Sequence, residues 1–141
     1  MAVYLDASAI IPLFLTDTFS SQVMETLRTL RQPLIISDWA ILEVSSVIVR
    51  QIRTKQLTQF EADTALTKVD LWFNKLVLTT STTPADIATA NTLVRRRNLV
   101  LRGPDAVHIA IAQRVNANLL TFDKGMQTAA REIGLALTLR N

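Results

Sequence analysis

The sequence predicts an α/β fold in which helices cover both faces of a parallel sheet. Short apolar segments with the length of strands alternate with longer helical segments along the whole chain. These short segments are apolar throughout rather than at every second residue, which is typical of strands buried on both faces. The chain has 141 residues, the commonest size for one independent domain, so we expect residues 1–141 to form a single domain.

Local signals place each element in order. The first strand ends at Asp6, and a helix follows with Ser8 near its start. Ser37 follows the second strand as an N-cap signal, and Thr58 with Glu61 has the spacing of a capping box that opens a long helix. We expect strands at residues 3–5, 34–36, 76–78, 119–122 and 135–139. We expect the later helices at residues 19–30, 39–53, 59–75, 84–97, 105–115 and 124–133.

The composition excludes several classes of protein. There are no cysteines, which excludes disulfides, thiolate catalysis and cysteine-ligated zinc and is compatible with the cytoplasm. No apolar run reaches the roughly 18 residues that a membrane span needs. Asp6 interrupts the apolar N-terminal segment, and no basic region precedes it, so no signal peptide is predicted. We therefore expect a cytoplasmic protein without membrane contact.

Basic residues lie next to acidic ones in two places. The formal net charge is +3, which says little by itself. Arg95 to Arg97 and Arg102 precede Asp105, however, and Lys124 directly follows Asp123. A basic rim of this kind suits a polyanionic substrate. The alternative is an exposed helix end where arginines complement the helix dipole.

Four acidic residues are harder to explain as ordinary surface charge. Asp6 and Asp123 each end a strand, so their side chains should project from the same edge of a parallel sheet. Glu43 lies in a mostly apolar stretch of helix, where a carboxylate is costly unless it is paired or bound to a metal. Asp105 opens a helix after a Gly-Pro pair. Taken singly, each aspartate could be a helix cap, and Glu43 could reach solvent at the rim.

Placed together at one edge, these four residues predict a metal site. Two carboxylates about 4 Å apart repel by roughly 4 kcal/mol at an effective dielectric constant of 20, so a cluster needs a cation or raised pKa values. Oxygen ligands without cysteine or a histidine cluster favour Mg²⁺ or Mn²⁺ over zinc. Such cations commonly serve phosphate chemistry, in which they activate a water molecule and neutralise charge on the leaving oxygen.

Ordered motifs in the chain resemble those of a known family. Residues 4–9, Tyr-Leu-Asp-Ala-Ser-Ala, resemble the opening motif of PIN-domain nucleases, especially the VapC-type toxins of toxin–antitoxin pairs. Residues 42–44 match the family's second acidic position, residues 101–110 the third, and residues 120–124 the fourth. Each motif is weak alone, but the ordered set is specific and spans nearly the whole chain.

The resemblance implies a three-layer α/β/α sandwich with a central parallel sheet, and Mg²⁺- or Mn²⁺-dependent endoribonuclease activity. It assigns catalysis and metal binding to Asp6, Glu43, Asp105 and Asp123. Ser8 and Thr121 fall where the family places small hydroxyl residues that steady the carboxylates. The resemblance also implies a homodimer, held inactive by an antitoxin that inserts a segment near the active site.

Other residues are candidates for the substrate side of this site. We expect Arg102 and Lys124 to contact phosphate groups, and Ser8 and Thr121 to line the same region. His108 lies three residues after Asp105, on the same helix face. It is either an assistant in proton transfer or a hydrogen-bonded structural histidine.

Two other functions remain as alternatives. The first is a non-catalytic RNA- or protein-binding module on the same scaffold. The second is a phosphotransfer enzyme with a strand-end aspartate nucleophile, but Ser8 stands where haloacid-dehalogenase-like phosphatases need a second aspartate.

Overall fold

The fold, seen in a computed structural model that describes residues 1–138, is built on a four-stranded parallel sheet in the order β3-β2-β1-β4. The strands are β1 (Ala2–Leu5), β2 (Leu34–Ser37), β3 (Leu78–Thr80) and β4 (Ala117–Leu120). The helices among these residues are α1 (Ala7–Phe14), α2 (Ser20–Thr29), α3 (Asp38–Arg53), α4 (Gln59–Lys75), α5 (Pro84–Val94), α6 (Gly103–Arg114) and α7 (Lys124–Glu132).

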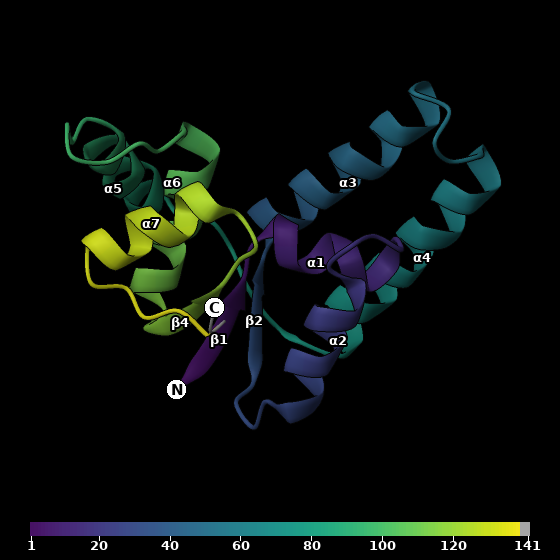
Figure 1. The fold of residues 1–141 in the computed structure, drawn as a ribbon, viewed down its shortest axis with the longest axis horizontal. Coiled ribbons are helices and arrows are strands. Elements are labelled where there is room, and N and C mark those ends of the chain that lie inside the picture. The colour runs from purple at the N-terminus through teal and green to yellow at the C-terminus, as the bar shows by residue number, and fades with distance from the viewer. Residues whose placement is uncertain (139–141) are drawn as a thin grey trace.

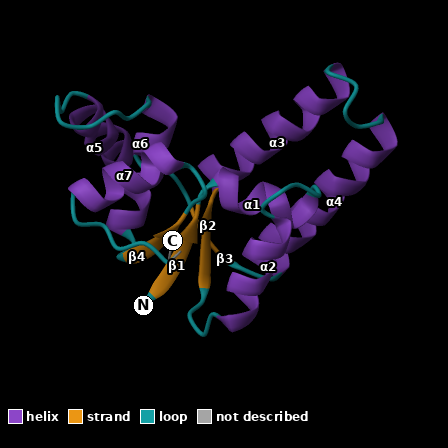
Figure 2. Cartoon of the chain, in the orientation of Figure 1, coloured by secondary structure: helices purple, strands orange, loops and turns teal. Residues whose placement is uncertain are grey.

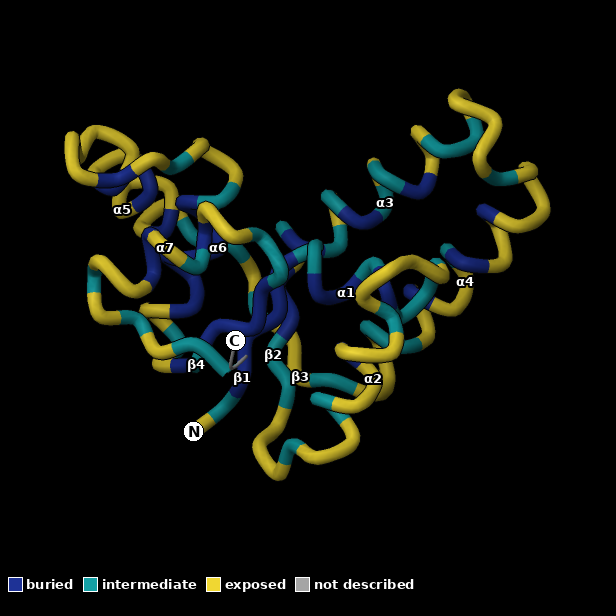
Figure 3. The backbone as a smooth tube through the Cα atoms, in the orientation of Figure 1, coloured by how far each residue is buried: buried dark blue, intermediate teal, exposed yellow. Residues whose placement is uncertain are grey.

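Helices cover the sheet on both faces, as the continuous apolar strands predict. Successive residues of β1 point to opposite faces: Tyr4 packs in a core cluster with residues of α5, α6 and α7, whereas Val3 and Leu5 pack with residues of α1, α3 and α4. Figures 1 and 2 show these two helical groups on either side of the sheet, and Figure 3 shows the buried residues concentrated between them. The three-layer α/β/α prediction is confirmed.

Two strands begin two residues away from the predicted positions. Leu76 is 71% exposed and still belongs to the end of α4, because its N–H donates to the Trp72 carbonyl, so β3 begins at Leu78 rather than at residue 76. Asn116 takes a positive φ of 54° after α6, a conformation that asparagine tolerates, and this lets β4 begin at Ala117 instead of residue 119. In both cases local backbone geometry outweighs the apolar pattern.

The predicted final strand at residues 135–139 is mostly absent from the described residues. Only an isolated bridge forms, between Leu119 and Leu137, and residue 139 lies outside the part of the chain that the structure describes. Helix α5 is also shorter than predicted and ends at Val94, so Arg95 to Arg97 lie in an exposed loop that leads to α6. No helix among residues 1–138 has the length and hydropathy to cross a membrane.

Candidate active site

Two aspartates lie at the carboxyl edge of neighbouring strands. Asp6 follows β1 and Asp123 lies three residues after the end of β4, and these two strands pair directly. Each also caps the next helix: Asp6 accepts from the N–H of Ala9 at the start of α1, and Asp123 accepts from the N–H of Met126 at the start of α7. Each aspartate therefore caps a helix and also lies at the common edge, as both interpretations predict. The cap at Asp123 uses one oxygen, so capping does not exclude a role at the edge.

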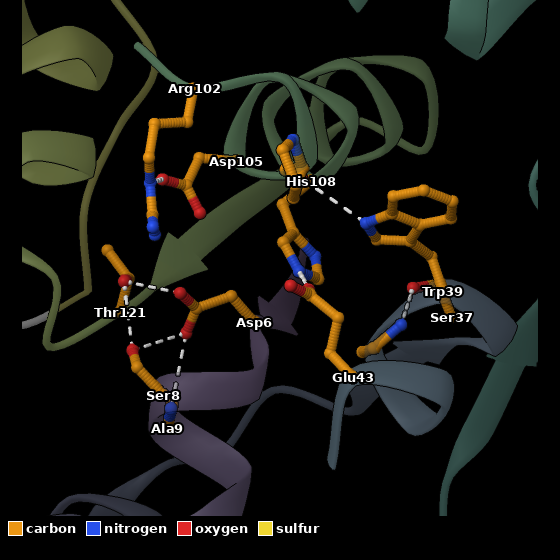
Figure 4. A network of polar contacts seen from close by, with 12 residues as sticks. Asp6, Ser8, Ala9, Ser37, Trp39, Glu43, Arg102, Asp105, His108 and Thr121 are labelled. Atoms are coloured by element: carbon orange, nitrogen blue, oxygen red, sulfur yellow. Dashed lines mark hydrogen bonds and ion pairs between the residues drawn. The ribbon is translucent and has the colours of Figure 1, made fainter. Parts of the chain in front are cut away.

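Asp6 is buried, and within residues 1–138 the donors that contact it are all neutral. Its Oδ1 accepts from the Ser8 hydroxyl at 2.8 Å and the Ala9 N–H at 3.2 Å, and its Oδ2 accepts from the Thr121 hydroxyl at 2.7 Å (Figure 4). Only 3% of Asp6 is exposed. Burial raises the pKa of Asp6, and the opposing effects of His108 and of these hydrogen bonds do not cancel the rise.

The hydroxyls of Ser8 and Thr121 also connect the two strand ends. Ser8 accepts from the N–H of Phe122 at 2.9 Å, and Thr121 accepts from the N–H of Asp123 at 3.1 Å. Each hydroxyl thus fixes the Asp6 carboxylate to the segment after β4. Because Thr121 is only 1% exposed, this geometry favours a role in positioning Asp6 over direct contact with a substrate.

Asp105 approaches this edge from the first turn of α6. Its side chain is 14% exposed, and its Oδ2 accepts from Nε of Arg102 at 3.3 Å. Burial raises the pKa of Asp105; the positive charge of Arg102 opposes this effect, and the negative charge of Asp123 adds to it. The structure thus brings Asp105 within electrostatic reach of Asp123.

Glu43 reaches the site from α3 and contacts Nε2 of His108 on α6. The Glu43 side chain is 31% exposed, whereas that of His108 is 1% exposed. The other ring nitrogen of His108, Nδ1, lies 2.6 Å from the Tyr4 hydroxyl, which lies 2.7 Å from the Ser37 hydroxyl. Of the two interpretations of His108, the hydrogen-bonded arrangement is the one observed.

Sequence reasoning missed Tyr4 and Ser37 as neighbours of the site. The sequence indicates for Tyr4 only a place in an apolar strand and in the opening motif, and for Ser37 only a helix cap. A usable signal existed: a tyrosine in a strand buried on both faces needs a partner for its hydroxyl, and the single histidine of the chain is the natural one.

Carboxylate oxygen is the right kind of ligand for Mg²⁺ or Mn²⁺, but the site is not a compact ligand cluster. Among residues 1–138, no three His, Asp or Glu side chains are grouped closely enough to hold a metal ion. Instead, each of the four predicted carboxylates has its own polar partner in the protein. Oδ1 of Asp105 and Oδ2 of Asp123 accept no hydrogen bond from the described residues. These oxygen atoms are therefore suitable ligands for a hard cation, and two of them still have lone pairs available to bind it.

The predicted basic residues lie in exposed positions. The Arg102 side chain is 79% exposed while it contacts Asp105. Arg95 to Arg97 and Lys124 are exposed as well.

Comparisons with known proteins agree with this arrangement. No curated protein matches the sequence significantly. Three similar solved structures are the VapC20 toxin of Mycobacterium tuberculosis, described as cleaving the sarcin–ricin loop (17% identity, TM-score 0.77, 99% of this chain and 100% of that chain); FitAcB of Neisseria gonorrhoeae (16%, 0.71, 96% and 95%); and VapBC-1 of nontypeable Haemophilus influenzae (17%, 0.67, 94% and 94%).

At these identities the structural likeness shows the fold alone. The family comparison goes further, because the model of the PIN domain matches residues 3–132 and so includes every element from β1 to α7. The chain belongs to the PIN domain family.

Proposed function

We propose that this protein is a Mg²⁺- or Mn²⁺-dependent endoribonuclease that hydrolyses RNA phosphodiester bonds, with residues 1–141 acting as one nuclease domain. The observation that supports this most is Asp6: a buried carboxylate without a cation in contact, fixed by two hydroxyls at the edge that Asp105 and Asp123 share. A carboxylate in such a position is costly unless a positive charge joins it. A bound cation is the simplest source of that charge.

In this proposal, Asp6, Asp105 and Asp123 hold the cation, and Glu43 is either a further ligand or the group that orients the attacking water. When bound, the cation supplies a water of lowered pKa and neutralises charge on the leaving oxygen. Ser8 and Thr121 keep the carboxylate of Asp6 in one orientation through the hydrogen bonds described above.

The exposed basic residues bind the substrate in this proposal. Arg102 and Lys124 contact substrate phosphates, and Arg95 to Arg97 extend this basic surface. Arg102 then has two partners, because its guanidinium also contacts Asp105. A substrate phosphate that draws Arg102 away from Asp105 would leave that carboxylate available to the cation.

The proposed setting is a toxin–antitoxin pair. This rests on the motifs of the sequence and on the fold shared with the structures named VapC20 and VapBC-1. The proposed partners are RNA and a cognate antitoxin, and the proposed assembly is a homodimer. A groove with an apolar floor of Leu13, Met24, Leu27 and Trp72, also lined by Ser21, Glu25 and Arg28, offers a surface for the antitoxin. A cytoplasmic location is proposed from the cysteine-free sequence.

The direct test is cleavage of labelled RNA by the purified protein in Mn²⁺ or Mg²⁺, repeated in excess EDTA. We expect products that appear with the metal and disappear with the chelator. The Asp6→Asn variant, purified in parallel, controls for a contaminating nuclease and should yield no products in either buffer.

The alternative is a non-catalytic RNA- or protein-binding module. One observation favours it: the carboxylates are individually paired rather than grouped as a ready metal site. Equal binding of RNA in Mn²⁺ and in EDTA, with no cleavage in either, would select this alternative.

A further inference from the structure

Four polar side chains from four elements form a single row that ends at the acidic edge. Ser37 lies at the end of β2, Tyr4 in β1, His108 in α6 and Glu43 in α3, and each contacts the next. Ser37 and Tyr4 have no exposed surface, and His108 has 1%. Figure 4 shows the His108 ring facing Glu43. The proposed function uses only the last member of this row, so the other three need a separate explanation.

One consistent set of directions satisfies every hydrogen bond of this row. The backbone N–H of Ala40 donates to the Ser37 oxygen at 3.0 Å, and the Ser37 hydroxyl donates in turn to the Tyr4 oxygen. A tyrosine hydroxyl has its proton at neutral pH, so Tyr4 can donate to His108. A carboxylate at Glu43 has no proton to give and can only accept. Each group in the row from Ala40 to Glu43 then donates one hydrogen bond to the next group.

This direction specifies one form of the histidine ring. The nitrogen that faces Glu43, Nε2, must have the proton, and in a neutral ring the other nitrogen, Nδ1, is then an acceptor. The Tyr4 hydroxyl donates to that acceptor. In the opposite tautomer, a bare Nε2 would face the carboxylate, so two acceptors would meet and repel.

We propose that Tyr4, supported by Ser37, is a positioning residue that holds His108 in its Nε2–H tautomer and thereby fixes the carboxylate of Glu43 at the acidic edge. This inference rests on the proposed function only for its effect on cleavage. The tautomer itself is a property of the RNA-free and metal-free protein. Loss of the Tyr4 hydroxyl removes the group that donates to Nδ1 and leaves Glu43 alone to favour this tautomer, so the His108 ring is held less firmly against the carboxylate.

The chain contains one histidine, which makes the inference directly measurable. In ¹⁵N-labelled protein at neutral pH with EDTA, the ring should give one pyrrole-type nitrogen at Nε2 and one pyridine-type nitrogen at Nδ1. In Tyr4→Phe both signals should move toward the average of the two tautomers. In Ser37→Ala they should move in the same direction by less.

The activity arm uses the same variants. For Tyr4→Phe we expect kcat for RNA cleavage to fall about 10-fold with KM unchanged, the lower end of the effect of removing a partner that orients an active-site group. The control is Thr83→Ala, which deletes a capping hydroxyl of α5 instead. It should leave both the ring nitrogen signals and kcat at parent values.

Three results would overturn the inference: a proton on Nδ1 alone in the parent protein, protons on both ring nitrogens, or signals in Tyr4→Phe identical to those of the parent. If Tyr4→Phe does not fold, the parent spectrum and Ser37→Ala decide the question. A parent protein that shows the expected tautomer but cleaves no RNA would refute the proposed function and leave the tautomer assignment intact.

Discussion

Two aspartates, Asp6 and Asp86, are equally buried and yet opposite in their chemistry. Asp6 is 3% exposed and Asp86 is 2% exposed, and each lies in the first turn or at the cap of a helix. Asp86 accepts from Nε of Arg114 at 2.8 Å and from Nη2 at 3.0 Å. From the part of the chain that the structure describes, Asp6 accepts only from hydroxyls and a backbone N–H.

The pKa values of the two carboxyls shift in opposite directions because Asp6 lies deeper within the protein and has no cation in contact, whereas Asp86 has Arg114. Burial raises the pKa of Asp86, but the Arg114 guanidinium and the N–H of Thr83 more than reverse the effect, so the net shift is downward. For Asp6 the net shift is upward, because burial outweighs the groups that oppose it. A buried carboxylate with a cation beside it stabilises the fold. A buried carboxylate without a cation is an uncompensated charge, and such exceptions to stable packing are typical of functional sites.

The strongest way to test this contrast is to remove the charge of Asp6. For Asp6→Asn we expect cleavage to fall by at least about 10³-fold, as for loss of a group that stabilises the transition state. We also expect the free energy of unfolding to stay unchanged or to rise, since an uncompensated buried charge has gone. Labelled-RNA cleavage and urea unfolding measure the two effects. Cleavage at the parental rate would show that the site is assigned wrongly.

Removal of the cation beside Asp86 should have the opposite pattern. Arg114→Met should lower the free energy of unfolding by about 2–3 kcal/mol, below the range for a fully buried pair because the arginine is partly exposed. Cleavage per folded molecule should change little. The matched control is Arg131→Met on α7, an exposed arginine that should leave urea unfolding unchanged. If both variants lowered the free energy of unfolding equally, the ion pair of Asp86 with Arg114 would contribute no more than an exposed arginine.

The hydroxyl that holds Asp6 should matter for activity more than for stability. Thr121→Val keeps the shape of the side chain and deletes the donor to Oδ2 of Asp6. We expect kcat to fall about 10- to 100-fold, the usual effect of losing a partner that orients a metal ligand. Thr67→Val, on the exposed face of α4, is the control for the substitution itself. Parental kcat in Thr121→Val would mean that Asp6 needs no such support.

The smallest effect is on the pH dependence of stability. Because the folded pKa of Asp86 is lowered, its contribution is fully present above the unfolded value of about 3.9 and is lost as pH falls through the folded value. Asp86→Asn should therefore be less stable than the parent at pH 6, and this gap should narrow as the solution is acidified below pH 4. Urea unfolding across this range measures the gap. A gap independent of pH would show that charge is not its source.

The sequence was sufficient for the architecture because the physical signals were local. The capping box at Thr58 and the apolar strands placed the elements in order, and that capping box is present. The strand limits at β3 and β4 depended on how α4 and α6 end, which the apolar pattern does not encode. The location of Asp6 and Asp123 at one edge followed from the parallel sheet.

The contacts within the site could not be predicted in the same way. The row from Ser37 to Glu43 joins residues that are 33, 104 and 65 positions apart in successive pairs, so no local pattern reveals it. The ion pair of Asp86 with Arg114 is likewise invisible in a sequence where Asp86 already serves as a cap. Specific polar partners depend on the tertiary packing of distant segments.

Helix α6 limits how this protein can diversify. It presents Asp105 in its first turn, His108 in the middle and Arg114 at its last residue, and every residue from Ala106 to Ala112 is buried. A larger side chain at one of these alanines would shift all three functions at once, since cores resist added volume. Changes in substrate preference are therefore easier to acquire in the exposed loop at residues 95–102. New side chains there alter the basic surface without displacing helix α6.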